Sequence, residues 1–163
     1  LPNDLEDIGN MAFYYCDGLT GELQIPNGTK HIGRAAFMYC RGFQGNLHLP
    51  ETLESISPEA FSHCENISGS LSIPYKIKTI EEGVFEQCGF NDDLILHNAI
   101  TVINENAFLG CEFRGELNLP NSISVIGENA FAGNNFSGSL VFPESLNSIG
   151  EGAFRSNSRI NNK

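Results

Sequence analysis

The chain has 163 residues, enough for one ordinary domain, and it is 40% hydrophobic and 18% charged. This composition excludes a disordered chain and a fibre. A formal net charge of −11 argues against nucleic acid, whose binding depends on Lys and Arg, and against docking on anionic lipid. No apolar run is long enough to span a membrane, so direct membrane insertion is not expected. No signal peptide opens the chain, although a signal removed during maturation would leave secretion open.

Phenylalanine recurs along the whole sequence at a nearly constant interval. The steps between seven Phe residues are 24, 24, 24, 23, 23 and 23, and an Ile stands five residues ahead of each. These are Phe13, Phe37, Phe61, Phe85, Phe108, Phe131 and Phe154. A unit this short cannot bury its own apolar side, so successive copies must stack. The sequence therefore predicts one repeat-solenoid domain over residues 1–163, built from seven coils of 23–24 residues.

Within each copy the predicted elements follow one order. The copy opens with L-x-[IL], as in Leu23-Gln24-Ile25, and this alternation predicts a short strand of a parallel sheet wall. A proline ends the strand, because proline cannot donate to a ladder. The next stretch, I-G-x-x-A-F-x-x-C, has apolar residues three and four apart, which predicts one or two short helical turns. A Gly then forms a tight corner into the next copy.

The segments "IPNGTKHIGRAAFMYC" (25–40) and "LPNSISVIGENAFAGN" (119–134) resemble the Treponema pallidum type of leucine-rich repeat, often called BspA-like. The resemblance covers nearly the whole chain. It implies a right-handed leucine-rich-repeat superhelix with a parallel sheet on one face. Family members are typically surface or secreted proteins of host-associated bacteria and some protists, and they are associated with adhesion to host matrix proteins and to other cells. The resemblance implies no catalytic residue and no cofactor.

Neither end of the chain shows an obvious capping repeat. Leu1 resembles the last strand residue of an earlier copy, and the final residues are polar and stop before another strand. This pattern predicts that the chain is a fragment, or the C-terminal part, of a longer repeat array. Because an uncapped edge exposes apolar core and strand backbone, it alternatively predicts self-association through the open ends of the solenoid.

Five cysteines occupy one position of the repeat, three residues after the Phe. They are Cys16, Cys40, Cys64, Cys88 and Cys111, and Asn134 and Asn157 take the position in the last two copies. A metal ladder or a set of disulfides would not tolerate Asn, whereas a core position would. Both side chains can donate a hydrogen bond to the backbone of the next coil. We therefore expect a buried, structural column of free thiols.

Three other features invite a chemical interpretation that the pattern does not favour. His63 adjoins Cys64, but Cys64 should point inward and its neighbour elsewhere, and no third catalytic group is implied. The column of Glu82, Glu105, Glu128 and Glu151 lacks a calcium-loop motif, so a solvated face is expected. The N-x-[ST] triplets at Asn27, Asn66 and Asn135 are common by chance in an Asn- and Ser-rich repeat. The sequence thus predicts no enzyme, no metal and no cofactor.

The outward positions of the predicted strands are the best candidate for a binding surface. They change from copy to copy while the inward positions do not, and solenoids bind partners through such extended faces. The residues are Glu22, Gln24, Asn46, His48, Ser70, Ser72, Asp93, Ile95, Glu116, Asn118, Ser139 and Val141. Ile95 and Val141 are the apolar members. We call this set the strand face.

One copy departs from the rest in "DLILHNAITVI" (93–103), where His97 replaces the strand-ending proline. The period shortens from 24 to 23 just ahead of it, where one residue is lost between Cys88 and Phe90. This combination indicates a junction between two kinds of coil and not a catalytic centre. The functional hint that remains in this stretch is Ile95.

These observations predict a non-catalytic binding or adhesion module of a secreted or cell-surface protein. The strand face would contact a protein or glycan partner, such as host matrix or another cell surface. The alternative is a structural spacer that holds another domain away from the cell and binds no partner of its own.

Overall fold

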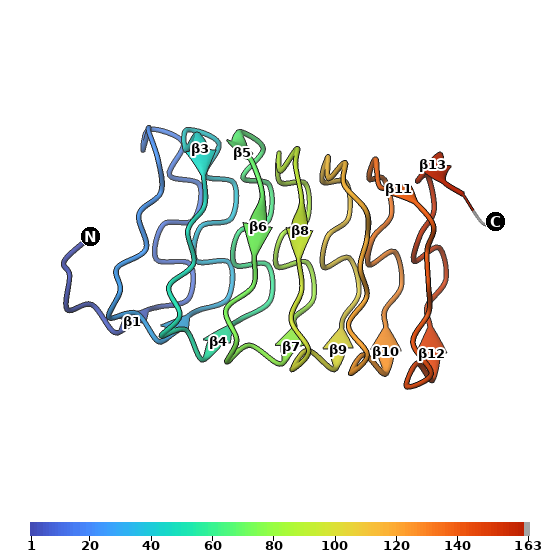
Figure 1. The fold of residues 1–163 in the computed structure, drawn as a ribbon. Helices are drawn as coiled ribbons and strands as arrows, with labels where there is room; N and C mark the ends of the chain where they lie inside the picture. The colour runs from blue at the N-terminus through green and yellow to red at the C-terminus, as the bar shows by residue number, and fades with distance from the viewer. Residues whose placement is uncertain (162–163) are drawn as a thin grey trace.

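The structure, a computed structural model, describes residues 1–161, and these form a single stack of seven coils (Figure 1). Every strand pairing is parallel and joins residues about one repeat apart, such as Ile8 with Ile32 and Ile103 with Ile126. The predicted leucine-rich-repeat solenoid with parallel strands is therefore confirmed. Residues 162 and 163 of the predicted domain lie outside the described residues.

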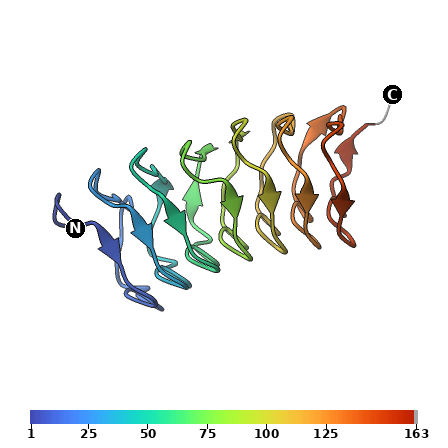
Figure 2. The same cartoon turned by 90° about the horizontal axis from the view of Figure 1, so that it is seen from below.

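The strands are two residues long and lie in three rows along the stack. The row that we call the Ile wall runs along the lower edge of Figure 1, and the view from below in Figure 2 shows its strands in sequence. It contains β1 (Asp7–Ile8), β2 (His31–Ile32), β4 (Ser55–Ile56), β7 (Thr79–Ile80), β9 (Val102–Ile103), β10 (Val125–Ile126) and β12 (Ser148–Ile149). The strand-face row contains β6 (Leu71–Ser72) and β8 (Leu94–Ile95). The corner row contains β3 (Gly45–Asn46), β5 (Ile67–Ser68), β11 (Ser137–Gly138) and β13 (Arg159–Ile160).

The L-x-[IL] pieces alternate in and out as predicted, but they pair only intermittently. Leu71 and Ile73 are buried while Ser72 between them is exposed. Ladder pairing on this face joins β6 to β8, and an isolated bridge joins Gln24 to His48. The longer ladders form instead on the Ile wall, where three strands and then four are paired in succession. The sequence analysis did not assign a sheet to that wall.

The predicted helical turns are wrong, because residues at two positions around each Phe have a left-handed backbone. In the second coil Ala35 has φ of 50° and Tyr39 has φ of 61°. The N–H groups of Ala35, Phe37 and Tyr39 donate to carbonyls of the following coil instead of back along a helix. The N–H groups between them close tight turns, as from Met38 to the carbonyl of Ala35. Apolar residues three and four apart thus mark a corrugated wall that binds coil to coil.

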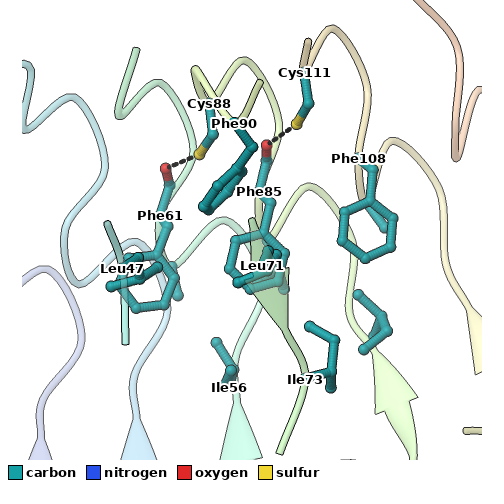
Figure 3. Packing of buried hydrophobic residues seen from close by; sticks show 14 of the residues in the cluster. Leu47, Ile56, Phe61, Leu71, Ile73, Phe85, Cys88, Phe90, Phe108 and Cys111 are labelled. Atoms are coloured by element: carbon teal, nitrogen blue, oxygen red, sulfur yellow. Dashed lines mark hydrogen bonds between the residues drawn. The ribbon is translucent and has the colours of Figure 1, made fainter. Parts of the chain in front are cut away.

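The core is built around the predicted Phe column. Rings of successive coils stack nearly parallel, with centroids 5.6 Å apart for Phe61 and Phe85 and 5.7 Å apart for Phe85 and Phe108. A second column begins where the repeat shortens, since Phe90 stacks on Phe113 at 5.3 Å and meets Phe85 edge-on. Figure 3 shows Phe61, Phe85 and Phe108 in line, with Phe90 beside them. Burying each ring contributes about 1.5–3 kcal/mol.

The cysteines occupy the predicted structural position between coils. The thiol of Cys88 donates to the carbonyl oxygen of Phe61 at 3.1 Å, and Cys111 donates to Phe85 at 3.0 Å (Figure 3). These bonds reach the preceding coil and not the next one, which corrects the direction that we expected. All five thiols are free, and four are buried. Burial raises the pKa of Cys40 to about 11 and of Cys111 to about 12, so the neutral thiol is the favoured form.

The Ile wall has one interruption, between β4 and β7. At other junctions the residue after the wall Ile donates to the preceding coil, as Asn104 does to Ile80 at 2.9 Å. Among the described residues no backbone hydrogen bond from Glu81 closes the junction with the third coil. The equivalent residue Gly127 lies so close to the preceding coil that an added Cβ would be 2.5 Å from the backbone nitrogen of Glu105. Pro58 occupies the position in the third coil that Glu105 has in the fifth.

Candidate functional site

The strand face has the exposure that its sequence pattern predicted. All nine residues that we chose as the partner-binding candidates are exposed, and the inward residues between them are buried or half-buried. The nine are Glu22, Gln24, Asn46, His48, Asp93, Ile95, Glu116, Asn118 and Val141. The structure brings them onto one face of the stack but does not gather them at one point.

The clearest feature of this face is a hollow of about 290 Å³ between the fifth and sixth coils, which we call the Ile95 hollow. It is lined by Asp93, Leu94, Ile95, Leu96, Glu116 and Asn118. Ile95 is 53% exposed although it lies within a strand. Four of the nine predicted residues therefore meet here, from two neighbouring coils.

A second hollow, of about 260 Å³, adjoins the first and shares Asn118 with it. Val141, which is 72% exposed, lines this hollow together with Phe142 and the carboxylate-bearing Glu144. At the other end of the stack, Glu22 and Gln24 line a separate hollow of about 350 Å³ beside Phe13. The predicted candidates are thus divided between two regions, and the larger group lies on the fifth to seventh coils.

The carboxylates of the strand face lie directly over the corner of the following coil. A Cβ added at Gly138 would meet Glu116 Oε1 at 2.9 Å, and Gly138 has φ of +79°. Asp93 lies in the same way over Gly115. The corner glycines therefore leave room for these acidic side chains, which remain exposed. No Lys or Arg occurs at any position of the strand face, so its charge is purely acidic.

His97 has a structural role at the corner, as its isolated replacement of proline suggested. Its Nδ1 accepts the N–H of Ala99 at 3.2 Å, so the proton resides on Nε2, which donates to the carbonyl oxygen of Pro74 at 2.9 Å. The ring also packs on Tyr75, with centroids 4.9 Å apart. Tyr75 is 66% exposed and escaped the sequence analysis, because it follows the strand and belongs to no recurring position.

Sequence reasoning also missed an aromatic stack on another wall. Tyr15 stacks on Tyr39 at 4.5 Å, and Tyr39 stacks on His63 at 4.6 Å. Their constant spacing of 24 residues was the available signal. His63 Nδ1 also lies 3.7 Å from the carboxylate of Glu65. Cys64 points into the core, where its thiol donates a hydrogen bond to the backbone carbonyl of Phe37. The two side chains therefore point apart, as predicted from the repeat.

The glutamate column, which was considered as a metal site, lies on the solvent-exposed surface. The four glutamates of the predicted solvated column, Glu82, Glu105, Glu128 and Glu151, are exposed. Within residues 1–161 no group of three or more His, Cys, Asp or Glu side chains is placed to hold a metal ion. The same part of the chain contains no helix long and apolar enough to cross a membrane.

Comparison with known proteins agrees with this architecture. The BspA type leucine rich repeat region matches the chain in six copies, over residues 1–111 and 36–161. The chain belongs to this leucine-rich-repeat family. No curated protein matches it.

Two solved structures of leucine-rich-repeat proteins resemble the chain. A leucine rich cell surface protein from Faecalibacterium prausnitzii is 32% identical, with a TM-score of 0.70, over 79% of this chain and 34% of that protein. A leucine-rich repeat protein from Bacteroides ovatus is 24% identical, with a TM-score of 0.65, over 94% of this chain and 45% of that protein. The second likeness concerns the fold alone. This BspA-type chain spans less than half the length of either relative.

Proposed function

We propose that this BspA-type segment is a non-catalytic binding module of a secreted or cell-surface protein, and that its strand face contacts a protein or glycan partner. The observation that supports the proposal most directly is the Ile95 hollow. An exposed apolar residue, Ile95, lies there between two carboxylates. On this face only the inward-pointing residues contribute to the core, and the outward-pointing residues do not. Such a surface can vary without cost to the fold, which is what a binding surface requires.

The family relation supports the location. The similar protein from Faecalibacterium prausnitzii is described as a cell surface protein. The acidic, variable strand face also fits contact with other macromolecules outside the cell. A spacer without a partner of its own is the alternative function. It predicts that the strand face binds no partner.

The proposal is tested by replacing Asp93, Ile95, Glu116 and Asn118 together with serine. Wild type and variant are screened by surface plasmon resonance against a panel of purified extracellular-matrix proteins and against a glycan array. We expect at least one selective interaction of the wild type, and we expect the variant to lose it. Thermal unfolding should be nearly unchanged, because none of the four side chains is buried.

A control variant replaces Glu82, Glu151 and Asn147 with serine. It removes two negative charges, as many as the strand-face variant does, but from other walls of the stack. This variant should bind like wild type. Binding that persists in the strand-face variant but disappears in the control would overturn the choice of face. A wild type that retains nothing from either panel would favour the spacer.

A further inference from the structure

We propose that the Ile95 hollow binds a segment of a partner protein that places one apolar side chain next to Lys or Arg residues. The inference deepens the proposed function and rests on it, because it names the kind of partner that the strand face takes. It depends on four properties of the hollow: its open backbone, its apolar centre, its charge and its size.

The first property is an unpaired strand edge. β8 pairs with β6 on one side, where Leu94 is in register with Leu71 and Ile95 with Ser72. On its other side, no ladder joins β8 to residues 117–118 of the sixth coil in the part of the chain that the structure describes. The hollow lies at this open junction. The fifth and sixth coils are therefore not joined by a ladder here, which leaves space between them for a side chain of a partner.

The second property is the apolar centre. The positions equivalent to Ile95 in neighbouring coils hold Ser72 and Asn118, so the fold does not require an apolar residue at this point. Leu96 next to it is only partly buried, although it belongs to the inward set. Ile95 and Leu96 together offer an aliphatic surface that a partner side chain would remove from water. Both lie in the middle of the stack, where coils flank them on both sides.

The third property is the charge around that centre. Asp93 and Glu116 flank Ile95, and neither forms an ion pair with another described residue. The adjoining hollow adds Glu144. A partner that covers Ile95 must also desolvate these carboxylates, and a cation compensates that loss. A neutral glycan brings no such cation, and an acidic glycan would be repelled.

The fourth property is size. The hollow, of about 290 Å³, is open to solvent and lies at the lower limit of the roughly 300–1,000 Å³ of pockets that enclose a small molecule. It accommodates one or two side chains presented by a larger surface. These properties together fit a cationic and apolar peptide segment, and they do not fit a free metabolite or a sugar chain.

The test uses three short synthetic peptides labelled with a fluorophore. One repeats Lys-Leu-Ser, one repeats Glu-Leu-Ser and one repeats Lys-Ser-Ser, so that charge and apolar content are varied separately. Fluorescence anisotropy then measures their binding to the folded chain at low and at high salt. We expect the Lys-Leu-Ser peptide to bind at least about tenfold more tightly than either of the others, and to weaken as salt rises.

Two variants locate the interaction. Ile95→Ser should weaken the Lys-Leu-Ser peptide about tenfold by removing the apolar contact, and the double variant D93N/E116Q should weaken it similarly by removing the charges. The double variant E82Q/E151Q is the matched control, since it removes two exposed charges elsewhere and should bind within about twofold of wild type.

Equal losses in D93N/E116Q and E82Q/E151Q would show that the peptide responds only to net charge, and would overturn the inference. Equal binding of all three peptides would overturn it as well. The variant with serine at Asp93, Ile95, Glu116 and Asn118 separates the two proposals. If it loses binding to a glycan or to an acidic protein, the proposed function stands and this inference fails. If that variant loses nothing that the wild type binds, both fail.

Discussion

The thiol of Cys111 donates a hydrogen bond to the backbone carbonyl of Phe85, 3.0 Å away in the preceding coil. One coil later Asn134 Nδ2 makes the same bond to the carbonyl of Phe108 at 2.8 Å. The position therefore selects a small side chain with a donor, and sulfur itself is not required. This explains why the repeat accepts Asn at a site that would otherwise suggest redox or metal chemistry.

Replacing Cys111 by Asn should therefore cost less stability than replacing it by Ala. Cys111→Ala removes the donor and leaves a small cavity, so we expect a loss of about 1–2 kcal/mol. Cys111→Asn retains a donor in a coil whose corner matches that of Asn134, including a Gly at the preceding position. The free energy of unfolding from urea denaturation measures both. Equal losses for the two variants would mean that packing alone decides the position.

The buried thiols should also make the fold sensitive to alkaline pH. Burial raises the pKa of Cys64, Cys88 and Cys111 above the ordinary value near 9. In the unfolded chain these thiols ionise as the pH passes about 9, while in the folded chain they remain protonated. Their stabilising contribution is complete below that pH and is lost as the pH rises, by about 1.4 kcal/mol per thiol and pH unit.

The check is a series of urea midpoints between neutral and alkaline pH. The variant Cys88→Ala should start lower at neutral pH but decline less steeply, because it has one thiol fewer to ionise on unfolding. Iodoacetamide should label Cys16, which is only half-buried, well before the other four. Rapid labelling of all five native thiols would contradict the structural position of the column.

The stacked Phe column predicts a large and local effect of truncation. Phe108 is fully buried and lies between Phe85 and Phe131, with centroids 5.7 and 5.5 Å away. Phe108→Ala should lower the free energy of unfolding by about 3–5 kcal/mol. Leu109→Ala is the control, since Leu109 is only half-buried and should cost much less. Similar losses for the two would show that the column does not dominate the core.

The open junction between β4 and β7 should be the first part of the Ile wall to exchange its amide hydrogens. The amide of Glu81 should exchange much faster than that of Asn104, which is bonded to Ile80 at 2.9 Å. We expect the ring of Pro58 to obstruct this junction, so replacing Pro58 by Glu, the residue found at the equivalent position 82, should slow exchange at Glu81. Hydrogen exchange followed by NMR resolves the two amides. Unchanged exchange in the Pro58 variant would assign the gap to another cause.

The periodic features of the fold were readable from the sequence because each recurs from copy to copy. The Phe column, the Cys position and the in-and-out alternation around Gln24 and Ile95 are all confirmed. The helical turns were wrong because apolar spacing of three and four does not distinguish a helix from a wall with left-handed residues such as Tyr39. Spacing records which side chains point inward, and it does not record where the N–H groups point.

The candidate site was only partly accessible to sequence reasoning. Exposure of Ile95 followed from the alternation, but the hollow beside it depends on a ladder that is absent between the fifth and sixth coils. No single residue encodes that absence. Tyr75 and its contact with His97 were likewise invisible, because neither residue shares its type with the equivalent positions of other coils.

The corrugated wall around the Phe column has an electrical consequence. The peptide units that end at Ala35, Phe37 and Tyr39 all direct their N–H groups toward the following coil and their carbonyls toward the preceding one. Each peptide unit has a dipole of about 3.5 D, and dipoles that align add together as they do in a helix. Ordinary strands cancel most of this effect by alternation. This wall therefore has a polar axis of its own, with its negative pole toward the first coil and its positive pole toward the last. The N–H groups of Gly33 on the Ile wall and of Gln44 at the corner donate to the preceding coil, so these walls oppose it.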